Sequence, residues 1–104
     1  MILSGEGKAF CAGYDLSYYA EGASQNKVVQ DMPWDPMQDY QFMWANTQHW
    51  MSMFRALKPV ICKVHGFAVA GGSDIALCAD LTIMADTAKI GYMPTRVWGC
   101  PTTA

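Results

Sequence analysis

Short apolar segments alternate with glycine-rich and helical stretches along the second half of the chain, and this order constrains the fold most strongly. Residues 60–64 and 80–85 have the β-branched, apolar composition of strands. Between them a glycine-rich run leads into residues 73–79, which have helical character, and residues 89–92 form a further short extended piece. Strands separated by helices are typical of α/β proteins, so we predict an α/β fold with a partly parallel sheet.

A long amphipathic helix is predicted over residues 36–57, ahead of the first of these strands. Asp35 is a favourable N-cap residue, and Pro36 suits a first helical turn. Apolar residues then recur at steps of three and four until Lys58 and Pro59, which should end the helix. The methionines and tryptophans of this stripe indicate a core or subunit contact rather than a cofactor site. The polar residues 17–34 predict a variable loop.

Composition excludes several classes of protein. The chain has 104 residues, of which 52% are hydrophobic and 15% charged, which suits one small packed domain and excludes a disordered segment. A net charge of −2 without a basic cluster argues against nucleic acid or an anionic membrane as partner. No apolar run approaches the ~20 residues of a membrane span. Four cysteines without paired metal-ligand spacing indicate reduced thiols, no bound metal and a cytoplasmic protein.

Two glycine turns could carry chemistry. Gly13 permits a tight bend after a short apolar run and leaves the amide of Tyr14 without an obvious strand partner. Gly71 and Gly72 precede a helix start, where free N–H groups and the helix dipole favour negative charge. Such donors can stabilise an oxyanion, at about 3 kcal/mol per donor. An ordinary strand turn and close helix–strand packing explain these glycines equally well when each is taken alone.

Together the two segments resemble the signatures of the crotonase (enoyl-CoA hydratase/isomerase) superfamily. Residues 8–16, Lys-Ala-Phe-Cys-Ala-Gly-Tyr-Asp-Leu, match the first signature. Residues 58–61, 66–74 and 78–81 match the second, and a long variable loop and helix separate the two blocks as in that family. The resemblance covers nearly the whole chain and implies a crotonase-like ββα core. Because both ends are abrupt, we expect residues 1–104 to be a partial domain, truncated at both ends.

The resemblance implies an enzyme that binds acyl-CoA thioesters, most simply an enoyl-CoA hydratase or isomerase of fatty acid metabolism. In the family, one backbone N–H from each signature holds the thioester oxygen as an enolate forms, and here these are the amides of Tyr14 and Gly71. Ala12, Tyr14 and Leu16 match the stretch that lies along the CoA moiety, and Gly72 supports the second donor. CoA enters as part of the substrate, so no separate cofactor is expected.

The catalytic carboxylates of the family are only partly present. Asp74 occupies the position of the first, with a side chain one methylene shorter than the usual glutamate, and is the expected acid/base. The second should follow the strand at Gly91, where Thr95 and Arg96 stand instead, and neither is a good general acid at neutral pH. A CoA-ester-binding protein without hydratase activity and an inactive fragment of a longer enzyme therefore stay open.

Two further expectations come from the family. Its members are usually trimers or dimers of trimers, so a homotrimer or hexamer is expected for the longer parent. Tyr14 is bulkier than the small residue often found at its position. Its ring could narrow the acyl pocket or point away from it, since only the amide is implicated.

Overall fold

The computed structural model describes residues 1–17 and 30–99, and it confirms the α/β fold. The elements in chain order are β1 (Ile2–Ser4), α1 (Pro36–Phe54), β2 (Ile61–Val64), β3 (Phe67–Val69), α2 (Gly71–Leu77), β4 (Leu81–Met84), β5 (Lys89–Gly91) and α3 (Pro94–Trp98). Residues 18–29, which make up most of the predicted variable loop, lie outside the described residues. The domain boundaries stay a prediction.

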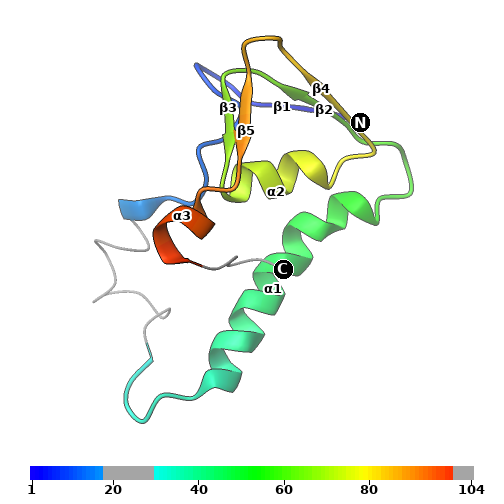
Figure 1. Ribbon diagram of the computed structural model, residues 1–104. Coiled ribbons are helices and arrows are strands. Elements are labelled where there is room, and N and C mark those ends of the chain that lie inside the picture. Colours follow the sequence, from blue (N-terminus) through cyan, green and yellow to red (C-terminus); the bar gives the residue numbers. More distant parts are fainter. Residues whose placement is uncertain (18–29, 100–104) are drawn as a thin grey trace.

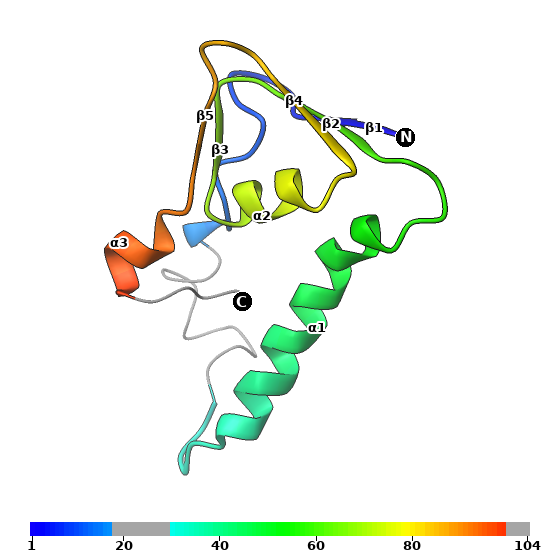
Figure 2. The same ribbon diagram turned by 45° about the vertical axis from the view of Figure 1, so that its right-hand side comes forward.

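The described strands form two small sheets, and every pairing in them is parallel. One sheet has the order β1-β2-β4, and the other pairs β3 with β5. In both views α2 lies between these sheets and α1, which extends away from them as a long arm (Figure 1 and Figure 2). The polypeptide passes from β3 of the two-stranded sheet directly into α2 and then enters the three-stranded sheet through β4, so the α2 N-terminus lies at the end of β3.

The core lies where β2, β3 and α2 meet the residues that follow β1. Along β2, Cys62 and Val64 are buried while Lys63 between them is exposed, as the two-residue period of a strand requires. Ala68 of β3 and Ala76 of α2 complete the contact, together with Phe10. These small side chains let α2 approach the sheet closely, which fixes the position of its N-terminus.

Helix α1 begins as predicted and ends earlier. The Asp35 carboxylate accepts the amide of Met37 at 2.9 Å, and Pro36 occupies the first turn. The helix stops at Phe54, not at residue 57, because the chain turns at Arg55 and leaves Leu57 fully exposed at 103%. Its apolar stripe is not part of the core, since none of its residues is buried. The Cys78 Sγ lies 3.7 Å from the Met51 Sδ, where α1 meets the end of α2.

Two elements were not predicted. Strand β3 lies inside the glycine-rich run, and α3 follows β5 directly with Pro94 at its start. Both are very short, so neither gives a clear periodic signal. Strands β2, β4 and β5 lie where extended segments were expected.

Candidate functional site

The two glycine segments predicted to act together are joined by backbone hydrogen bonds. The amide of Phe10 donates to the His65 carbonyl at 2.9 Å, and that of Cys11 donates to the Phe67 carbonyl at 3.0 Å. The Val69 amide returns a bond of 3.1 Å to the Cys11 carbonyl. Residues 10 and 11 thus run beside β3 as an added extended piece, and the chain that follows passes over the start of α2.

Close packing explains why glycine stands at two positions of this crossing. Gly13 has a φ of +103°, and a Cβ there would lie 3.0 Å from the Ala70 Cβ and 3.9 Å from the Gly71 nitrogen. A Cβ on Gly72 would lie 2.5 Å from the carbonyl oxygen of Cys11. Both approaches involve atoms on or next to the backbone, which cannot turn aside as a long side chain can. The backbone at Gly13 is therefore held close to the backbone at Ala70 and Gly71.

The α2 N-terminus is built around Ala70, which has a strained conformation with φ 51° and ψ −127°. Its amide donates to the Gly91 carbonyl at 3.1 Å. Its carbonyl accepts the Ser73 amide at 2.9 Å, the Ser73 hydroxyl at 2.6 Å and the Asp74 amide at 3.3 Å. The amide of Gly71, the residue after Ala70, donates to no backbone carbonyl within residues 1–17 and 30–99. A helix-terminal amide of this kind favours an anionic partner.

The ring of Tyr14 is turned toward the site. A Cβ placed on Gly71 would lie 3.3 Å from the Tyr14 Cε2 and 3.6 Å from its Cδ2. The side chain keeps 41% exposure, so the ring covers the Gly71 backbone without being part of the core. Ala12 and Leu16, the other residues expected along the CoA moiety, are both exposed.

Asp74 lies in the first turn of α2 and is half-buried. Burial raises the pKa of the Cys78 thiol, one turn further on, and the negative charge of Asp74 raises it further. Asp74 and Cys78 are four residues apart and so share one face of α2, the face on which Cys78 contacts Met51 of α1.

The region expected to hold a second carboxylate contains none. The Thr95 hydroxyl donates to the Tyr92 carbonyl at 2.9 Å, so its proton is already engaged. Arg96 is exposed on α3. Neither side chain supplies an acid at this place, in keeping with the sequence analysis.

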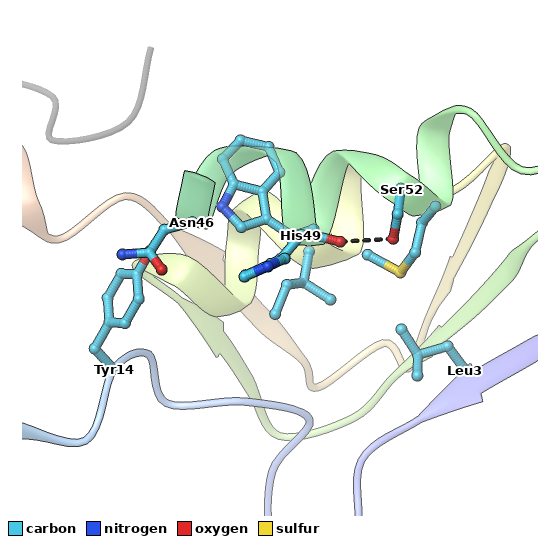
Figure 3. A pocket seen from close by; sticks show the side chains of 8 residues that line it. Leu3, Tyr14, Asn46, His49 and Ser52 are labelled. Atoms are coloured by element: carbon cyan, nitrogen blue, oxygen red, sulfur yellow. Dashed lines mark hydrogen bonds between the residues drawn. The ribbon is translucent and has the colours of Figure 1, made fainter. Parts of the chain in front are cut away.

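A cavity of about 530 Å³ borders this arrangement. It is lined by Leu3, Tyr14, Asn46, His49, Trp50, Ser52, Met53 and Ile75. Tyr14 lies toward one end of the cavity and Leu3 toward the other, with Asn46, His49 and Ser52 along α1 (Figure 3). Tyr14 is the one predicted site residue in this lining. The α1 residues were missed as site residues, although their spacing places them on one helix face.

The polar side chains of Asp80 and His65 have structural roles. The Asp80 carboxylate accepts the Val60 amide at 2.7 Å and so fixes the start of β2. The His65 Nε2 lies 3.0 Å from the Gly7 carbonyl oxygen, which holds the turn before residue 8. In the described part of the chain, no cluster of three or more His, Cys, Asp and Glu side chains could hold a metal ion. No helix there is long and apolar enough to cross a membrane.

Comparisons with known proteins agree with these motifs. A family model described as enoyl-CoA hydratase/isomerase matches residues 1–102. A mevalonyl-coenzyme A hydratase of Beauveria bassiana is 34% identical over 98 residues, which are 92% of this chain and 33% of that protein. A carnitinyl-CoA dehydratase of Proteus mirabilis is also 34% identical, over 85% of this chain and 29% of its own length.

Solved structures show the same relationship. The crystal structure of an enoyl-CoA hydratase from Mycobacterium smegmatis is 48% identical and superposes with a TM-score of 0.77, covering 96% of this chain and 36% of that one. The chain thus spans about a third of the length of these relatives. With the family model matched over almost every residue and the fold shared, the chain belongs to the enoyl-CoA hydratase/isomerase family, the crotonase superfamily.

Proposed function

We propose that this chain binds an acyl-CoA thioester and stabilises its enolate with the backbone amides of Tyr14 and Gly71. The activity is enoyl-CoA hydration or double-bond isomerisation, with Asp74 as acid/base. The single observation that carries the proposal is the crossing of residues 11–14 over the α2 N-terminus. There the Gly71 nitrogen lies 3.9 Å from the position of a Cβ on Gly13.

Fixed amides suit this chemistry because negative charge develops on the thioester oxygen only during the reaction. Donors that are already oriented need no reorganisation at that moment, and one such donor contributes about 3 kcal/mol. The Ala70 hydrogen bonds and the glycine contacts at positions 13 and 72 support this orientation, since they hold the backbone on both sides of the proposed donors.

Asp74 is the carboxylate nearest in sequence to the Gly71 amide within the site. In isomerisation it takes a proton from one carbon of the acyl group and returns it to another, while the electron pair passes through the enolate. In hydration, water gives one proton to Asp74 as its oxygen bonds to the β-carbon, the electron pair of the double bond moves to the thioester oxygen, and Asp74 returns the proton to the α-carbon as the enolate collapses. Both routes use the same donors and a single carboxylate.

A second candidate is binding of a CoA ester without turnover. It is favoured by the Thr95 hydroxyl, which is bonded to the Tyr92 carbonyl where the family's second carboxylate would be expected. Ala12 and Leu16, both exposed, are proposed to contact the CoA moiety in either case, and Gly72 to support the second donor.

The test combines unfolding and turnover. Crotonyl-CoA at about 100 times its dissociation constant should add about 2.7 kcal/mol to the free energy of unfolding. Product formation from crotonyl-CoA that Asp74→Asn abolishes would support the enzyme, whereas binding without turnover would support the second candidate. Asp80→Asn is the matched control, because Asp80 serves the start of β2 and not the site. Unfolding that crotonyl-CoA leaves unchanged, with no turnover, would refute both candidates.

We also propose a cytoplasmic location, which is supported by free thiols at Cys11, Cys62 and Cys78. A homotrimer or hexamer of the longer parent is proposed as well. Its support is the exposed aromatic and methionine side chains of α1, among them Met37, Tyr40 and Trp44. Light scattering on the purified parent would test the assembly, and a monomer would refute it.

A further inference from the structure

We propose that Tyr14 is a specificity-determining residue, whose ring favours short acyl chains because it stands between the proposed oxyanion donors and the open apolar cavity of about 530 Å³. This inference rests on the proposed function, since it assumes that the thioester oxygen binds at the Tyr14 and Gly71 amides. The amide and the ring of one residue would then have separate roles, the first in catalysis and the second in substrate choice.

The Tyr14 ring lies beside the backbone of Gly71. Three consecutive atoms on one edge of the ring, Cδ2, Cε2 and Cζ, lie 3.6, 3.3 and 3.7 Å from the position of a Cβ on Gly71. The ring therefore covers the backbone of the second donor residue. A thioester held at both amides has its acyl carbons next to this ring.

The Tyr14 ring also lies at the cavity. Tyr14 lines the cavity, whereas Gly71, Gly72 and Asp74 do not. The ring is thus in contact with the donor residue on one side and with the cavity on the other. Figure 3 shows it at the end of the cavity opposite Leu3. Because the ring occupies this boundary, an acyl chain that starts at the donors meets the ring before it can reach the cavity.

The rest of the cavity lies beyond the ring. The cavity has the size of a small-molecule site and is lined by apolar side chains such as Leu3, Met53 and Ile75. Such a surface suits the methylene groups of a long acyl chain. The ring occupies the end of this open space that is nearest to Gly71, and removal of the ring would extend the acyl site along the apolar lining.

The experiment compares crotonyl-CoA with decenoyl-CoA, in the wild type and in variants that all keep the backbone amide of residue 14. The quantity measured is the ratio of kcat/KM for the long ester to kcat/KM for the short one. Tyr14→Ala should raise this ratio at least about tenfold, because one extra methylene bound in an apolar pocket changes kcat/KM by at least about that factor. Tyr14→Phe keeps the ring and should leave the ratio as in the wild type. Tyr14→Leu, which removes the ring with less loss of volume, should fall between them and serves if the alanine variant does not fold.

The outcomes separate the two proposals. An unchanged ratio in Tyr14→Ala, with both esters still converted, overturns the inference and leaves the proposed function intact. A wild type that already prefers decenoyl-CoA overturns it in the same way. A wild type that neither binds nor converts either ester refutes the proposed function, and the inference falls with it.

Discussion

Replacing Gly72 by alanine should loosen the contact between residues 8–16 and α2 and destabilise the protein. The new Cβ would lie 2.5 Å from the Cys11 carbonyl oxygen and 2.7 Å from the Cys11 Cβ. Ordinary contact begins near 3.4 Å, so the two segments must separate by about 0.9 Å. That movement is resisted by the bonds of Cys11 to Phe67 and Val69, at 3.0 and 3.1 Å.

The size of the effect follows from these contacts. Losing the two backbone bonds costs about 1 kcal/mol each. Residual overpacking costs about 1–3 kcal/mol more. Alanine regains about 1 kcal/mol because it favours the helix over glycine. The free energy of unfolding should therefore fall by about 2–4 kcal/mol, a large part of the stability of a small domain.

Urea unfolding followed by circular dichroism measures this change. Gly91→Ala is the matched control, since a Cβ there meets nothing within 4 Å, and its effect should stay within about 0.5 kcal/mol. If Gly72→Ala were as stable as Gly91→Ala, residues 8–16 would not be held against α2 by this close approach. The proposed pairing of the Tyr14 and Gly71 amides would then lose its structural support.

Four further predictions follow from individual residues. Asp74→Asn should lower kcat for the proposed reaction at least about a hundredfold while the fold is retained, as steady-state assays and circular dichroism would show. The same substitution should lower the pKa of the Cys78 thiol, because the negative charge of Asp74 raises that pKa. The pH dependence of alkylation by iodoacetamide measures the change, and Cys78→Ser identifies which thiol reacts. Burial raises the pKa of Cys62 and Cys78 above the ordinary 9.0, so their contribution to stability is full below that pH and is lost as the pH rises through the folded-state pKa values. Urea midpoints that stayed constant as the pH rose from about 8 to about 11 would contradict this prediction. Asp80→Ala should lower the free energy of unfolding by about 1–2 kcal/mol, since it leaves the Val60 amide without its carboxylate partner. A loss of activity per folded molecule would contradict a purely structural role for Asp80.

The sequence predicted the parts of the fold that depend on local signals. Asp35 and Pro36 marked the start of α1 because capping and proline geometry act within one turn. The end of the helix was wrong by three residues, since the apolar spacing continues to Leu57 although the helix stops at Phe54. Nothing local distinguishes an apolar residue that packs from one that stays exposed.

The proposed donors were accessible to sequence reasoning for a related reason. Glycines at positions 13, 71 and 72 indicate a close backbone approach. In the structure the two segments are joined by the backbone hydrogen bonds of Cys11. The cavity was not accessible, because it depends on how α1 lies relative to α2 and on residues as far apart as Leu3 and Ile75. A pattern in one segment carries no information about such a distance.

The two kinds of contact also differ in what substitution can do to them. The backbone crossing is fixed by glycines whose replacement meets backbone atoms, so change there costs stability before it changes chemistry. Most of the side chains that line the cavity are on α1, none of whose residues is buried, so substitutions of these α1 residues should cost little stability. A protein built in this way can keep its proposed oxyanion donors while its acyl preference varies. Tyr14 belongs to both parts, since its amide lies in the crossing and its ring lies at the cavity. Substitutions at this one position therefore separate catalysis from substrate choice most directly.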